Sequence, residues 1–130
     1  MAIIRSFRDL RSYQQARSEA GRIFEATKTF PKEEKFAMTD QIRRSSRAVK
    51  SMIAEAWGHR RYPASFASKL TDAIGEANET QSWLDDALDC GYISPAQHKD
   101  FDAAWQSVGG MIASMILKAD DFCGTKKTDL

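Results

Sequence analysis

Basic side chains are concentrated between residues 41 and 61, where Glu55 is the only acidic residue. Three of the cations are spaced by four and three residues, so on a helix they form one stripe. The six cations in this stretch are Arg43, Arg44, Arg47, Lys50, Arg60 and Arg61. Guanidinium groups match phosphate oxygens, and clustered cations bind nucleic acids by releasing condensed counterions. These six residues are therefore the candidate nucleic-acid-binding site.

A second reading of the basic stretch is structural. Asp72, Glu76, Glu79 and Asp86 recur at heptad-compatible steps further along the chain. Basic and acidic stripes on two helices can pair within one bundle or across a subunit interface, where they set register and partner choice. An unpaired, solvated basic face is the third possibility, and the residues alone leave all three open.

The sequence contains no recognisable catalytic or metal-binding motif. His59 and His98 are the only histidines, and neither accompanies a Ser or Cys in a nucleophile motif. The Glu-x-x-His pairs of bundle metal sites are absent, and Cys90 and Cys123 lack ligand spacing. We therefore expect a non-enzymatic protein with no catalytic residue, no metal, no cofactor and no small-molecule substrate.

Charge is polarised along the chain although the net charge is only +1. Residues 1–61 carry 14 Lys/Arg against 7 Asp/Glu, whereas residues 62–102 carry 2 against 8. Such polarity favours charged partners or self-association. The sequence shows no signal-peptide pattern and no apolar run long enough to span a membrane, and its two cysteines form no disulfide framework. We expect a cytoplasmic protein without membrane contact.

Apolar residues recur at three- and four-residue steps in four segments, which predicts helices over approximately 7–27, 39–57, 64–90 and 95–122. Residues 31–38 are expected to form a short helical connector. Thr39 is the predicted N-cap of the second helix and Gly58 its stop, and Ser94-Pro95 with Gln97 is typical of a capping box. With short connections, these helices predict one all-α domain over residues 1–130, an antiparallel up-down-up-down four-helix bundle.

The apolar surface of the fourth helix is wider than one packing seam requires. Trp57, Trp83 and Trp105 also lie near apolar faces, which favours core or subunit-interface packing over stacking on bases. A monomer hides that much apolar surface poorly, so the sequence predicts a cyclic homo-oligomer closed by a head-to-tail interface.

From Phe7 to Ile93 the sequence resembles the four-helix-bundle proteins encoded by intervening sequences of bacterial 23S ribosomal RNA genes. The landmarks that match are Phe7-x-x-Leu10, Phe30-Pro31-x-x-Glu34, Thr39-x-Gln41-Ile42-Arg43-Arg44, Ile53-Ala54-Glu55, and Glu79 ahead of Gly91-Tyr92-Ile93. Met52 and Ala56 stand where the family usually has Asn and Gly.

The resemblance implies a four-helix bundle, a ring-like homopentamer, and a role in binding RNA or nucleoprotein. Relatives also include the accessory protein of diversity-generating retroelements, which presents a basic surface to nucleic acid and to a reverse transcriptase. The leading hypothesis is an oligomeric adaptor that contacts RNA through its basic surface. The alternative is a scaffold or protein-protein interaction module whose charge stripes serve self-assembly alone.

Overall fold

The computed structural model describes residues 3–124, and within that range it contains helices and no strand. Residues 1–2 and 125–130 of the predicted domain lie outside the described residues. Four long helices form the body of the molecule: α1 (Arg11–Thr27), α2 (Met38–Gly58), α3 (Pro63–Asp89) and α4 (Pro95–Leu117). Three short elements accompany them: η1 (Phe7–Asp9), η2 (Lys32–Glu34) and α5 (Ala119–Cys123). The predicted all-α class is confirmed.

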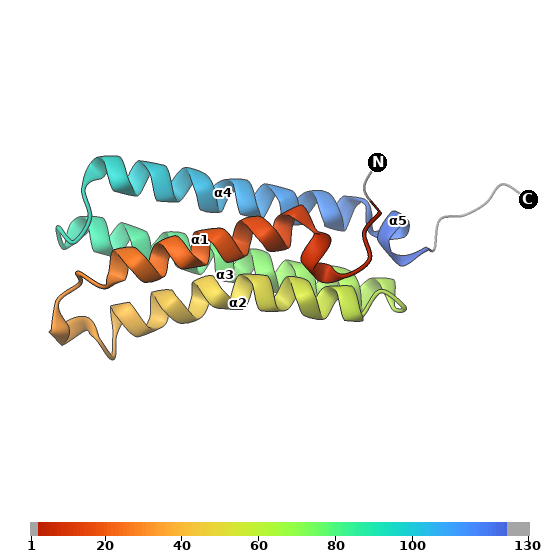
Figure 1. Cartoon of the computed structure of the whole chain (residues 1–130), viewed down its shortest axis with the longest axis horizontal. Coiled ribbons are helices and arrows are strands. Elements are labelled where there is room, and N and C mark those ends of the chain that lie inside the picture. The colour runs from red at the N-terminus through yellow and green to blue at the C-terminus, as the bar shows by residue number, and fades with distance from the viewer. Residues whose placement is uncertain (1–2, 125–130) are drawn as a thin grey trace, which may run out of the picture.

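The four long helices run alternately up and down, and each packs against the next one in the sequence (Figure 1). Helix α1 also lies against α4, which closes the bundle. The α2–α3 turn lies at one end of the bundle together with α5 and the N-terminal segment, and the α1–α2 and α3–α4 connections lie at the other end. This arrangement confirms the predicted up-down-up-down topology.

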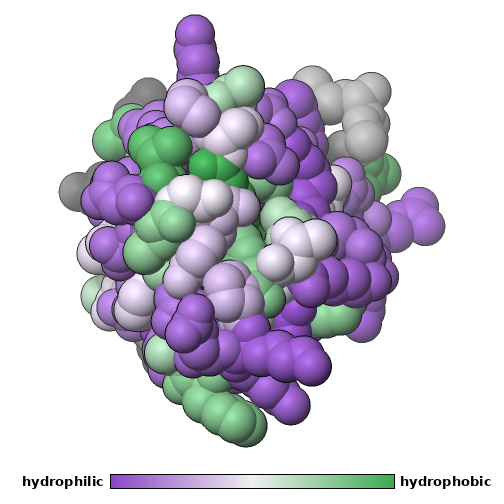
Figure 2. All heavy atoms as spheres, turned by 90° about the vertical axis from the view of Figure 1, so that its left-hand side faces the viewer, coloured by the Kyte–Doolittle hydropathy of each residue, from purple (hydrophilic) through white to green (hydrophobic). Residues whose placement is uncertain are grey.

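The end that carries the α1–α2 and α3–α4 connections is largely hydrophilic, with scattered hydrophobic residues among the polar ones (Figure 2). The two connections are held together there by aromatic contact, since the rings of Phe30 and Tyr92 lie 5.4 Å apart. Gly91 has a φ of 75°, a left-handed conformation that glycine adopts without strain. Ser94 then starts α4 with the predicted capping box.

Four predicted helix boundaries differ from those of the structure. The first helix begins at residue 11 and not at residue 7, because Leu10 is extended and separates η1 from α1. Thr39 is not the N-cap of α2: it is buried inside the helix, which Ala37 precedes without a side-chain cap. Gly58 is the last residue of α2, whereas the prediction placed it just after the end of the helix. The fourth helix is interrupted at Lys118, so its predicted end forms the separate helix α5.

The core is formed by side chains that all four long helices direct to the bundle axis. The largest fully buried ones are Ile23, Ile42, Ile53, Phe66, Leu70, Leu84, Trp105 and Ile112. Burial of each such side chain stabilises the fold by roughly 1.5–3 kcal/mol. Trp105 is therefore a core residue, as the sequence indicated, whereas Trp57 and Trp83 are half-buried. Among the described helices, none is both long and apolar enough to cross a membrane.

Candidate nucleic-acid interface

Two of the predicted cations lie over an aromatic ring of the neighbouring helix. The Arg43 guanidinium carbon is 4.6 Å from the centroid of the Phe24 ring of α1, and that of Arg47 is 5.4 Å from the same centroid. Arg43 also donates from Nε to the hydroxyl of Thr27 at 2.7 Å. Such cation–π contacts hold the guanidinium groups in place without neutralising their charge.

Lys50 lies one helical turn beyond Arg47 on the same face of α2. Within residues 3–124, no carboxylate approaches Arg43, Arg47 or Lys50 within ion-pair distance. We call these three cations together with Phe24 the α1–α2 strip. Its positive charge is uncompensated in the described part of the chain, so it is available to an anionic ligand.

Arg44 is directed away from the α1–α2 strip. Its guanidinium pairs with two carboxylates of α3, Glu76 at 3.3 Å and Glu79. The hydrogen bond with Glu76 is the main reason that the pKa of Arg44 is raised above its ordinary value. Residues 43 and 44 are adjacent in the sequence but point about 100° apart on the helix, so they meet different neighbours.

Pairing with the acidic stripe within one bundle is therefore observed for Arg44 and for no other of the six cations in the described part of the chain. The stripe formed by Arg43, Arg47 and Lys50 does not pair with the acidic stripe of α3 in this subunit. A separate ion pair, Lys69 with Glu55 at 3.5 Å, contributes to the same α2–α3 contact. Asp72 and Asp86, the other members of the acidic stripe, make no ion pair within the described residues.

Arg60 and Arg61 lie beyond the end of α2, at the α2–α3 turn and away from the strip. The Arg60 guanidinium carbon is 3.5 Å from the centroid of the Trp57 ring, and its Nε donates to the Trp57 carbonyl at 2.8 Å. Arg61 is exposed. The structure therefore divides the six predicted cations into three groups. Three cations belong to the α1–α2 strip, Arg44 pairs with α3, and the last two lie at the α2–α3 turn.

Phe24 is the member of the site that sequence reasoning missed, because its position in the apolar repeat of α1 predicts a core residue. Tyr13 and Arg17 lie further toward the start of α1, on the same face of the helix as Phe24. Both also line a shallow groove of about 450 Å³ that Arg8 borders. The sequence signal that could have extended the candidate site to α1 is the spacing of seven residues between Arg17 and Phe24, which places both on one face of a helix.

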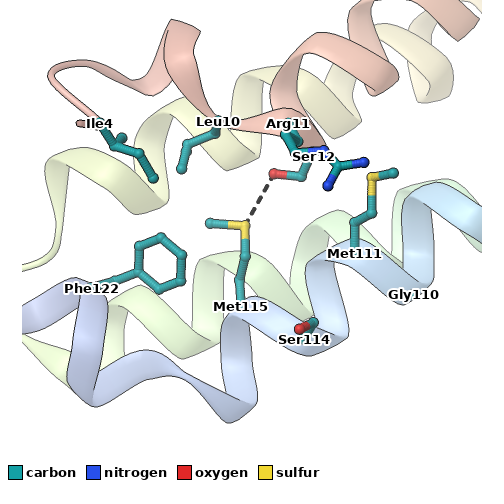
Figure 3. Close-up of a pocket in the computed structure, with 9 residues that line it drawn as sticks. All are labelled: Ile4, Leu10, Arg11, Ser12, Gly110, Met111, Ser114, Met115 and Phe122. Atoms are coloured by element: carbon teal, nitrogen blue, oxygen red, sulfur yellow. Dashed lines mark hydrogen bonds between the residues drawn. The ribbon is translucent and has the colours of Figure 1, made fainter. Parts of the chain in front are cut away.

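A second surface feature is apolar and lies between the start of α1 and the end of α4 (Figure 3). Ile4 and Leu10 face Met115 and Phe122 across a groove of about 470 Å³, and Met111 lies one turn before Met115 in α4. The Ser12 hydroxyl donates to the Met115 sulfur at 3.0 Å and joins the two walls.

The residue that ends α4 is a separate apolar feature, since 88% of Leu117 is exposed and it does not line the groove. This is one of the few large hydrophobic side chains that the described fold leaves in solvent. Helix α4 thus contributes Met111 and Met115 to the apolar groove and leaves Leu117 in solvent, in keeping with the wide apolar surface predicted for the fourth helix.

Fold and surface together define an antiparallel four-helix-bundle protein with a cation and aromatic strip along one side. Comparison with known families extends this description. The family model for the 23S rRNA-intervening sequence protein matches residues 8–114, and the chain belongs to this family.

A solved structure supports the assignment. The chain is similar to a protein with unknown function from the S23 ribosomal protein family of Bacteroides thetaiotaomicron, with 30% identity and a TM-score of 0.73. The similarity covers 82% of this chain and 95% of the other. A search of curated proteins finds no match.

Proposed function

We propose that this protein is a non-enzymatic adaptor that binds RNA through the α1–α2 strip. The observation that carries the proposal is the set of three cations on one face of α2, with no carboxylate partner in the described chain and with Phe24 beneath two of them. Guanidinium groups held in place on a ring bind phosphate oxygens, and their planes can also stack on bases. The resemblance to this family, which implies a role in binding RNA or nucleoprotein, agrees with the proposal.

The same proposal includes self-association into a ring. Its support is the apolar α1–α4 groove, since contiguous apolar surface marks interaction sites, and Leu117 is a further exposed apolar side chain of α4. A ring of subunits, five by the family resemblance, would repeat the α1–α2 strip around its circumference and raise the effective concentration of cations for one RNA. We place the protein in the cytoplasm, where the free thiols of Cys90 and Cys123 stay reduced.

A scaffold without RNA binding is the competing function, and one observation favours it. Arg44 is already committed to Glu76 and Glu79, which shows that α2 cations can serve packing. An acidic surface of a second subunit would neutralise Arg47 and Lys50 in the same way. The scaffold hypothesis thus predicts that charge reversal in the strip disrupts the oligomer.

The deciding experiment compares Arg47→Glu with the matched charge reversal Lys99→Glu. Lys99 is exposed on α4 and makes no ion pair in the described residues, so this variant has the same net charge with an intact strip. RNA affinity is measured by fluorescence anisotropy over a range of salt concentrations, and assembly by light scattering on the same samples. Loss of one contact should reduce the slope of log affinity against log salt by about 0.7 for a single strand.

We expect Arg47→Glu to weaken RNA binding and leave assembly intact, and Lys99→Glu to leave both unchanged. Equal weakening by the two variants would mean that overall charge, and not the strip, attracts RNA. Loss of assembly in Arg47→Glu, or a wild-type protein that binds no RNA at low salt, would replace the proposal by the scaffold.

A further inference from the structure

A compact group of metal-ligating side chains lies on the opposite pair of helices, α3 and α4. His98 and Asp102 are four residues apart on α4, so they share one face of that helix, and Asp85 faces them from α3. One ligand atom from each of the three residues lies within 4.8 Å of the other two. The His98 Nε2 atom is 2.8 Å from Oδ1 of Asp85.

The carboxylate of Asp102 is held in place by a second residue of α3. The Gln81 amide nitrogen donates to Oδ1 of Asp102 at 3.1 Å and contacts Oε1 of Gln106 at 3.2 Å. Metal sites commonly orient their ligands with such outer hydrogen bonds. The geometry of the three ligands is thus set by two helices and does not depend on a flexible loop.

No Lys or Arg side chain separates the two carboxylates of this group in the described part of the chain. Asp85 and Asp102 lie within the same 4.8 Å cluster, and neither forms an ion pair with Lys or Arg among residues 3–124. The surrounding sequence adds to the negative potential, because residues 62–102 contain 8 acidic and 2 basic side chains. Carboxylates this close repel each other unless a positive charge lies between them.

We propose that Asp85, His98 and Asp102 form a binding site for a divalent transition-metal ion, for which Zn²⁺ is the best match. An imidazole nitrogen with two carboxylates is a ligand set that Zn²⁺ accepts, with water completing a tetrahedron. Bonds of about 2.0–2.2 Å place tetrahedral ligand atoms roughly 3.3 Å apart. The ion would replace the hydrogen bond between His98 and Asp85 after a small separation of the two side chains.

The site is open enough for an ion to enter, since 66% of the Asp85 side chain and 20% of the His98 side chain are exposed. A bound ion would link α3 to α4 close to the turn that connects them, on other helices than the α1–α2 strip. The proposed metal site can therefore be tested independently of the proposed RNA binding.

The test uses the full chain with Cys90→Ser and Cys123→Ser, because free thiols also bind Zn²⁺. Co²⁺ serves as the spectroscopic probe, and Zn²⁺ is titrated by calorimetry and by displacement of Co²⁺. The chain has two histidines, so His59→Ala is the matched control for His98→Ala. The His59 Nδ1 atom forms a hydrogen bond of 2.6 Å with the Ser65 hydroxyl, and His59 lies outside the cluster.

We expect saturable binding of one ion per chain and a rise in Kd of at least about ten-fold in His98→Ala, with His59→Ala unchanged. Asp102→Asn should weaken binding in the same direction, and circular dichroism establishes that each variant is folded. The proposal is overturned if wild-type protein shows no saturable binding below about 1 mM. It is equally overturned if His98→Ala binds as wild type does, or if both histidine variants lose affinity to the same extent.

Discussion

Reversal of charge at Arg44 should destabilise the monomer fold, because this residue joins α2 to α3 through Glu76 and Glu79. Arg44 is 47% exposed, so solvent screens both ion pairs and each contributes roughly 0.5 kcal/mol. Arg44→Ala should then cost about 1 kcal/mol. Arg44→Glu adds repulsion of similar size and should cost about 2 kcal/mol. For a chain of 130 residues, this lowers Tm by about 6–10 °C.

Thermal and urea unfolding followed by circular dichroism measure this difference. Arg61→Glu is the matched control, because Arg61 is exposed and makes no ion pair within residues 3–124; it should change the free energy of unfolding by less than about 0.5 kcal/mol. Adding Glu76→Lys and Glu79→Lys to Arg44→Glu should recover most of the loss, and 1 M salt should shrink every difference. Equal Tm shifts in Arg44→Glu and Arg61→Glu, or no recovery on swapping the charges, would refute the reasoning.

Three further predictions concern the core, the thiols and the apolar surface. Trp105→Ala should cost about 3–5 kcal/mol in urea unfolding, because its side chain is fully buried and leaves a cavity; a cost below 1 kcal/mol would contradict its place in the core. Cys90 is exposed, whereas burial raises the pKa of the Cys123 thiol, so a maleimide at neutral pH should label Cys90 first. Mass spectrometry of the labelled peptides measures the order, and earlier labelling of Cys123 would contradict the prediction. Leu117→Glu should weaken self-association in sedimentation without lowering Tm of the subunit, and an unchanged sedimentation coefficient would exclude this residue from the interface.

The four long helices and their order were predictable because each carries its own apolar repeat, and turn residues separate them. The capping box at Ser94 was equally visible, since its hydrogen bonds join residues three apart in the sequence. The start of α2 was not predictable from Thr39. Tertiary packing buries that residue inside the helix, although its hydroxyl finds no partner in the described part of the chain.

Local sequence determined that cations gather in α2, but the tertiary structure decided which of them are free. The rotation of about 100° between successive helical residues sends Arg44 to the carboxylates of α3 and Arg43 to the ring of Phe24. The approach of Asp85 to His98 was likewise invisible in the sequence. It depends on the relative rotation of α3 and α4, which packing of their buried faces sets and no spacing of residues within one helix reveals.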